Sequence, residues 1–450
     1  MPTVVAQSAS RHTYPKESPT AMSDPSTWDS LPQRLPDWFR DAPLGIFIHW
    51  GPYSVPAWAE PTAELGAVPD DAGWFAHNPY AEWYFNTIRV EGSPAAEHHR
   101  EVHGDAPYDD FLDQWDTSDF DPAAWADLFR RAGADYVVPT TKHHDGVTLW
   151  DAPGTGDRNT VHRGPQRDLV GEIATAVTEA GMRFGVYYSG GLDWHVRPTE
   201  PLVSGEDVHD LKRPRDDEYG KYCASHVRDL IDRYSPDVFW NDIGWPDENF
   251  HFEEGGLGQL LEHFYTSRPE GLINDRFAGA HQDFVTTEYQ AGEIPDGQPW
   301  ENCRGVGLSF GYNQVEDASQ YMSGAQAVRH VVDAVSKGGR VLLNVGPRAD
   351  GSLHELQVAA LESLGEFMAE HKAHLAGSRG LGELELDGVD WARAVEKDGK
   401  CHVFFSGPAG AVRLDASALP GGFDWPTGGV EATLAGEDAA PVAISAARAG

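Results

Sequence analysis

Apolar and polar residues alternate along the chain in blocks that predict helices and strands in turn. Within residues 121–140, Asp121-Pro122 has the form of a helix N-cap followed by proline. The apolar residues that follow have the spacing of one helix face: Trp125, Leu128, Phe129 and Ala132. Gly133 then ends the helix as a C-cap, and residues 136–140 read as a strand.

Helices and strands alternate in this way over about 300 residues. We predict further helices around residues 170–177, 222–234, 325–336 and 356–368, and further strands at residues 45–48, 184–189, 237–242, 272–274 and 341–345. Alternating helices and strands indicate parallel strands joined by crossover helices. A doubly wound sheet is the competing architecture. The length and the polar residues at the strand ends favour an eight-stranded α/β barrel of the TIM type.

The pattern changes near both ends of the chain. Residues 1–35 are polar and rich in Ser, Thr and Pro, so we expect a flexible N-terminal arm. Residues 376–450 alternate apolar and polar positions between Gly and Asp turns, without a helical period. We therefore expect three parts: an arm (1–35), a barrel (36–375) and a small C-terminal β-sandwich (376–450).

The composition of the chain disfavours some classes of binding partner. The 450 residues carry a net charge of −37, which disfavours nucleic acid and anionic membranes but not a neutral sugar. The three cysteines, Cys223, Cys303 and Cys401, give neither a disulfide framework nor metal-ligand spacing. No apolar run has the length of a signal peptide or a membrane span, so we expect a cytoplasmic protein.

Residues that could act in catalysis or bind a substrate lie at the predicted strand ends, where barrels of this kind carry their active residues. These positions hold His49, the pair His143 and His144, Tyr187, Asp242 and Arg276, and Glu288 lies in a predicted loop further on. Trp240 and Asp242 are two residues apart in a strand, so they share a face. An aromatic wall beside a carboxylate suits a glycosidase nucleophile.

Other chemistries find less support. His143 and His144 are candidate metal ligands, but neighbours in a strand point to opposite faces and no third ligand has a motif spacing. The chain contains neither G-x-S-x-G nor G-x-x-x-x-G-K-[ST]. We therefore expect no metal and no cofactor.

Seven motifs occur in one order between about residue 36 and residue 375. They are GIFIHWG (45–51), NPYAEWY (78–84), KHHDG (142–146), FGVYYSGGLDW (184–194), PDVFWND (236–242), SFGYN (309–313) and GGRVLLNVGPRADG (338–351). In these motifs the chain resembles glycoside hydrolase family 29, the α-L-fucosidases. The resemblance implies a distorted (β/α)8 barrel with a C-terminal β-sandwich, retention of configuration and no cofactor.

The resemblance also assigns residues. It implies that Asp242 is the nucleophile. It implies substrate contacts for His49, Glu82, Trp83, His143, His144, Tyr187 and Trp240. Tyr187 is preferred to Tyr188 because Tyr188 shares a face with Phe184 and Val186, which suits packing against helices.

The acid/base residue is harder to assign, because the family carries it on variable loops. Close relatives have an arginine about twelve residues before a glutamate in a T-P-E-Y-like run, which here gives Arg276 and Glu288. Glu293 and Glu301 are the alternatives, and Glu82 is a further competitor that better suits hydroxyl binding.

The sequence thus predicts a retaining exo-α-L-fucosidase that acts on fucosylated oligosaccharides or glycoconjugates. Two alternatives stay open: an inactive fucose-binding protein on the same scaffold, and a hydrolase of a related sugar with an axial hydroxyl, such as galactose. Homo-oligomerisation also stays open.

Overall fold

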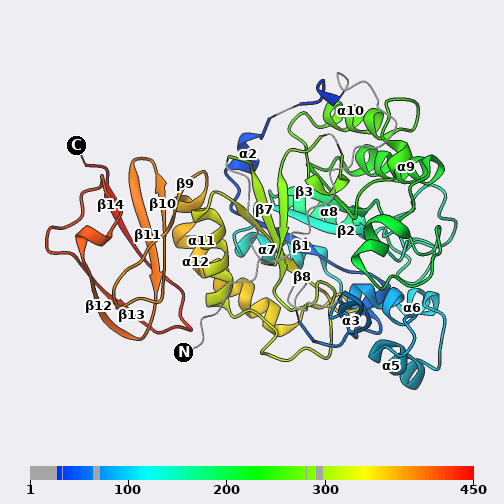
Figure 1. Cartoon of the computed structure of the whole chain (residues 1–450), viewed down its shortest axis with the longest axis horizontal. Coiled ribbons are helices and arrows are strands. Elements are labelled where there is room, and N and C mark those ends of the chain that lie inside the picture. Colours follow the sequence, from blue (N-terminus) through cyan, green and yellow to red (C-terminus); the bar gives the residue numbers. More distant parts are fainter. Residues whose placement is uncertain (1–27, 33, 64–70, 280, 290–296, 450) are drawn as a thin grey trace.

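The computed structural model describes residues 28–449 apart from 33, 64–70, 280 and 290–296 (Figure 1). The barrel strands are β1 (Leu44–Ile48), β2 (Tyr136–Lys142), β3 (Arg183–Ser189), β4 (Val238–Asp242), β5 (Leu272–Ile273), β6 (Val285–Glu288), β7 (Trp300–Gly305) and β8 (Arg340–Val345). The longer helices are α5 (Pro94–His103), α7 (Pro122–Arg131), α8 (Leu169–Glu179), α9 (Asp217–Tyr234), α10 (Leu257–Ser267), α11 (Gly324–Ser336) and α12 (Glu355–Leu375). Shorter helices are α2 (Asp37–Arg40), α3 (Asp71–Ala76), α4 (Tyr84–Thr87) and α6 (Asp109–Gln114).

The eight barrel strands form one parallel sheet in the order β5-β4-β3-β2-β1-β8-β7-β6. Its two edges meet, because Asn274 and Phe284 form a parallel bridge and Asp283 N donates to Ile273 O at 3.0 Å. The described residues between β5 and β7 contain the 3-10 turn Asp275–Phe277 and strand β6 but no α-helix. The predicted distorted (β/α)8 barrel is confirmed, and the distortion lies at this seam.

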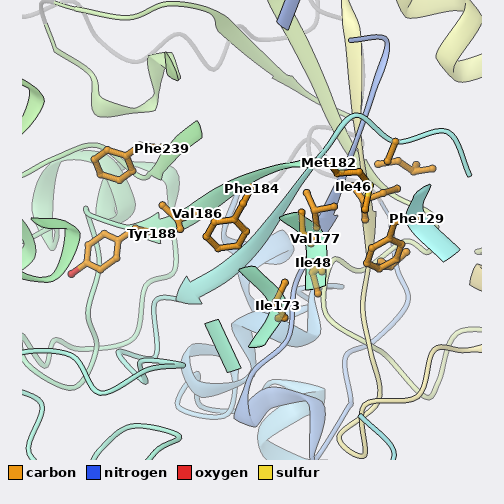
Figure 2. Packing of buried hydrophobic residues seen from close by; sticks show 14 of the residues in the cluster. Ile46, Ile48, Phe129, Ile173, Val177, Met182, Phe184, Val186, Tyr188 and Phe239 are labelled. Atoms are coloured by element: carbon orange, nitrogen blue, oxygen red, sulfur yellow. The ribbon is translucent and has the colours of Figure 1, made fainter. Parts of the chain in front are cut away.

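The two faces of each strand have different partners. On β3, Phe184, Val186 and Tyr188 belong to the outer apolar cluster, which also contains Ile173 of α8 (Figure 2). The Tyr188 hydroxyl contacts His226 of α9. Tyr187 faces inward and packs with aromatic side chains of β1 and β4. The prediction that Tyr187 faces the barrel interior and Tyr188 the helices is therefore confirmed.

Helix ends follow the capping signals in the sequence. The Asp121 carboxylate accepts hydrogen bonds from the backbone N–H groups of Ala123 and Ala124, as the predicted N-cap of α7 requires. Ser323 and Gln326 form a reciprocal capping box at the start of α11.

All strands after α12 are antiparallel. They are β9 (Arg379–Glu383), β10 (Trp391–Lys397), β11 (Lys400–Ser406), β12 (Gly410–Leu414), β13 (Val430–Leu434) and β14 (Val442–Ala447). Four form the sheet β14-β11-β10-β9 and two form β12-β13, at the left of Figure 1. Phe404 contacts Phe367, and Arg393 pairs with Asp333, so this sheet packs on α11 and α12.

At the other end, most of the expected arm lies outside the described residues. Its described end packs on the core through Trp28 and Leu31, both buried. Trp28 makes an edge contact with Phe252 at 4.8 Å.

Several elements were not predicted from the sequence, among them helices α5 and α6. Residues 285–288, expected in a loop, form strand β6. Strand β7 and helix α10 were not predicted. None of the helices within the described ranges is long and apolar enough to cross a membrane.

Candidate active site

The residues expected at the site meet at the carboxyl ends of the barrel strands. His49 follows β1, His143 and His144 follow β2, Asp242 ends β4 and Glu288 ends β6. Loops supply the rest: Glu82 and Trp83 lie in the 3-10 turn Ala81–Trp83, and Arg276 lies in the turn after β5.

Asp242 is buried and held from three sides. Its Oδ1 accepts from Arg276 Nη1 at 2.9 Å, its Oδ2 accepts from the Tyr187 hydroxyl at 2.8 Å, and His144 Nε2 lies 3.9 Å from Oδ2. Burial alone would raise the pKa of Asp242, but the Arg276 guanidinium and the hydrogen bond from the Tyr187 hydroxyl outweigh it and hold this pKa below its usual value. The carboxylate therefore stays ionised, as a nucleophile must.

Arg276 joins the two proposed catalytic carboxylates. Its Nη1 donates to Asp242 and its Nη2 donates to Glu288 Oε2, each at 2.9 Å. The guanidinium also lies over the Trp240 ring, 4.6 Å from its centroid, and its Nε donates to Thr286 Oγ1 at 3.0 Å. One rigid cation thus fixes the position of both acids.

Asp242 and Glu288 are each followed by a residue whose backbone lies in the left-handed region of φ. Ile243 has φ 59° and Tyr289 has φ 53°. For residues other than glycine this backbone conformation costs about 1–2 kcal/mol, and such strain clusters at functional sites. Tyr289 is held by a stacked contact with Tyr80 and by a hydrogen bond from its hydroxyl to Leu308 O.

The histidines form a neutral cluster. The expectation that His143 and His144 face opposite ways was wrong, because they lie beyond the regular strand and their ring centroids are 4.0 Å apart. Burial lowers the pKa of His49 to about 4 and of His144 to about 3, and it lowers that of His143 well below its usual value. Within the part of the chain that the structure describes, no three His, Cys, Asp or Glu residues are arranged to hold a metal ion.

Aromatic rings line the inner wall. Tyr187 stacks on Trp240 with centroids 5.6 Å apart, and Trp83 packs edge-on against His144 at 5.2 Å. Other strand-end tryptophans serve the outer core instead, among them Trp50 and Trp245.

The competing acids have other surroundings. Glu82 Oε2 accepts from Gly311 N at 2.8 Å and from Ser309 Oγ at 3.2 Å, and burial raises the pKa of Glu82 to about 7. Both oxygens of Glu301 are bonded deeper in the barrel, to the Tyr136 hydroxyl and to Trp240 Nε1. Glu293 lies outside the described residues.

Two residues bonded to the histidines were missed at the sequence level. Ser189 contacts His144, and Asn344 contacts His49. Asn344 interrupts the apolar strand VLLNV of β8, and a polar residue inside such a strand is the signal that identifies it.

Comparison with known proteins agrees with the fold and the motifs. Residues 14–373 match the model of the α-L-fucosidase family. The chain is 30% identical over 366 residues to the α-L-fucosidase of Dictyostelium discoideum, covering 78% of this chain and 74% of that protein. It is 31% identical over 354 residues to the human tissue α-L-fucosidase, covering 76% and 69%.

Solved structures are similar as well. The crystal structure of Thermotoga maritima α-fucosidase in complex with fucose matches with a TM-score of 0.80 at 41% identity, over 92% of this chain and 97% of that one. An α-L-fucosidase isoenzyme from Paenibacillus thiaminolyticus matches with a TM-score of 0.67 at 25% identity, over 92% and 98%. The chain belongs to the α-L-fucosidase family, so the resemblance seen in its motifs is confirmed.

Proposed function

We propose that the protein is a retaining exo-α-L-fucosidase that removes terminal fucose from fucosylated glycans, with Asp242 as nucleophile and Glu288 as acid/base. The observation that carries this proposal is the contact of both carboxylates with the single guanidinium of Arg276. Retention requires two carboxyl groups about 5–5.5 Å apart, and a shared guanidinium keeps its two partners close.

Charge balance explains how one arginine serves both steps. In the first step Asp242 attacks the anomeric carbon while Glu288 donates a proton to the leaving oxygen. Asp242 becomes a neutral ester as Glu288 becomes a carboxylate, so Arg276 faces one negative charge before and after. In the second step Glu288 takes a proton from water, the ester is hydrolysed, and the charge returns to Asp242.

The side chains around Asp242 and Glu288 recognise the sugar. His49, His143, His144 and Glu82 are proposed to bind the hydroxyls. Trp83 and Trp240 offer apolar surface to the C6 methyl group, which distinguishes fucose from galactose. A pocket that accepts a methyl group disfavours the extra hydroxyl of galactose by leaving it unpaired.

Assays on matched nitrophenyl glycosides test this proposal. We expect turnover of the α-L-fucoside to exceed that of the α-L-galactoside and the β-D-galactoside by about tenfold or more. Proton NMR of the fresh reaction should show the α-anomer of fucose first. Binding of fucose without turnover would support the inactive binding protein, and a faster galactoside would support the related hydrolase.

A further inference from the structure

The hydrogen bonds behind two of the histidines determine which ring nitrogen carries the proton. His49 Nδ1 lies 2.7 Å from Asn344 Oδ1, while Asn344 Nδ2 donates to Phe310 O at 2.7 Å. Turning the amide over would place Oδ1 against the Phe310 carbonyl, two acceptors with no proton between them. Asn344 therefore presents an acceptor, and His49 must carry its proton on Nδ1.

Ser189 determines in the same way which ring nitrogen of His144 carries the proton. Its hydroxyl oxygen lies 2.7 Å from His144 Nδ1 and 2.9 Å from Leu192 O, to which it donates. A hydroxyl has one proton, so the contact with the imidazole requires Nδ1–H as the donor. In the opposite arrangement Ser189 would donate to Nδ1, and two oxygens would then stand 2.9 Å apart without a hydrogen.

The other nitrogen of His144 faces the reacting centre. Nε2 lies 3.9 Å from Asp242 Oδ2, which is beyond hydrogen-bond distance, so no proton is shared between them. The two atoms are neighbouring acceptors. His143 differs, because its buried Nδ1 has no hydrogen-bond partner among the described residues.

We propose that Asn344 and Ser189 are positioning residues that lock His49 and His144 in the Nδ1–H tautomer, so that both rings present a bare Nε2 to the substrate. The inference rests on the proposed function for the identity of that substrate. Substrate hydroxyls at these two rings must donate, while Tyr187 and Arg276 are already committed as donors to Asp242. His143 is left to adapt its tautomer to the hydroxyl it meets.

Neutron diffraction from crystals of the deuterated full-length protein at neutral pH tests the tautomers directly. The proposal requires deuterium on Nδ1 and none on Nε2 of both His49 and His144. Deuterium on Nε2 of either ring overturns the assignment for that ring. This result does not depend on turnover, so a protein with these tautomers and no fucosidase activity would refute only the proposed function.

Asn344→Asp tests the consequence for activity. A carboxylate beside His49 stabilises the imidazolium and raises the pKa of His49 from about 4. At acidic pH Nε2 then carries a proton and the acceptor is lost. The ratio of variant to native kcat/KM should therefore rise about tenfold or more from about pH 5 to about pH 9.

Asn302→Asp is the matched control. Asn302 Oδ1 lies 2.8 Å from Nε2 of His330, which is on helix α11 outside the barrel. The same exchange there should leave this ratio independent of pH. A ratio for Asn344→Asp that is also independent of pH would overturn the role of Asn344.

Ser189→Ala frees the His144 ring. We expect kcat/KM to fall about tenfold or more and deuterium to appear on Nε2 of His144 in the variant crystal. Ser336→Ala removes another buried hydroxyl, which donates to Asp333 O in α11, and should leave kcat/KM unchanged. A Ser189→Ala variant that keeps deuterium on Nδ1 alone would overturn the role of Ser189.

Discussion

At the scale of single residues, the contacts of Arg276 organise the proposed chemistry. The strand pattern and the family resemblance together were enough to propose Asp242, whereas Glu288 was proposed through the resemblance. The contact of both with one guanidinium was not predictable, because it depends on how the short strands β5 and β6 meet at the barrel seam. The roles of Asn344 and Ser189 were equally unpredictable, because they depend on hydrogen bonds between neighbouring strands of the barrel, from β8 to β1 and from β3 to β2.

Replacing the proposed acid/base should have an effect that depends on the leaving group. Glu288→Ala removes the proton donor, which a nitrophenolate barely needs and a sugar alcohol needs strongly. We expect kcat/KM to fall about 10²–10⁴-fold on a fucosyl disaccharide and far less on the nitrophenyl fucoside. Azide should restore turnover of the nitrophenyl substrate and yield fucosyl azide of retained configuration, as NMR of the product can show.

Glu355→Ala, at an exposed carboxylate on α12, is the control and should match the native protein on both substrates. Equal losses on both substrates for Glu288→Ala, with no azide product, would transfer the role to Glu82, Glu293 or Glu301.

At the scale of elements, prediction succeeded where the barrel layers are regular. Strands β1 to β4 and β8 are runs buried on both faces. Helices α7, α8 and α11 have clear apolar periods because each buries one face. Strand β7 (WENCRG) was not predicted because it contains a buried charged residue. Glu301 points into the barrel, where its carboxylate accepts hydrogen bonds from Tyr136 and Trp240. Strand β6 was not predicted because it has only four residues, all partly buried, so it shows no alternation of buried and exposed positions.

The loops after β3 and β4 fit together at Gly191. Its N–H donates to Asp242 O at 3.1 Å, and a Cβ at this position would lie 1.9 Å from Ile243 O. Gly191→Ala must therefore push the Asp242 turn aside. We expect kcat/KM to fall about 100-fold, because displacement of a catalytic group by about 1 Å has effects of this size.

Gly421→Ala is the matched control, since a Cβ there meets nothing within 4 Å. It should leave kcat/KM and the melting temperature unchanged. If Gly191→Ala kept native kcat/KM, the close packing of these two loops would not be what positions Asp242.

At the scale of the whole molecule, buried ionisable groups set the pH range of stability. Burial raises the pKa of Glu82 and of Glu301 from 4.5 to about 7, so the folded protein holds these protons more tightly than the unfolded chain. Stability therefore falls as pH rises from about 4.5 to about 7. Burial lowers the pKa of His226 and His330 from 6.5 to about 3, so stability also falls as pH drops below about 6.5.

Glu301→Gln should remove part of the decline on the alkaline side. Glutamine has the same shape and no titrating proton, and the Tyr136 hydroxyl can accept from its amide. The free energy of unfolding, measured with denaturant at about pH 5 and about pH 8, should fall less in the variant than in the native protein, by roughly 1–3 kcal/mol. Glu431→Gln, at an exposed carboxylate, should follow the native curve. Parallel curves for Glu301→Gln and the native protein would show that Glu301 does not titrate in this range.

The most direct test of the proposed mechanism is to trap its covalent intermediate. A 2-deoxy-2-fluoro-fucosyl fluoride forms the glycosyl-enzyme but slows its hydrolysis, because fluorine destabilises the oxocarbenium-like transition state. Mass spectrometry of the digested protein should then find one fluorofucosyl group on the peptide that contains Asp242, and none in Asp242→Asn. A label on another carboxylate, or no label in a protein that the reagent inactivates, would contradict the assignment of Asp242 as nucleophile.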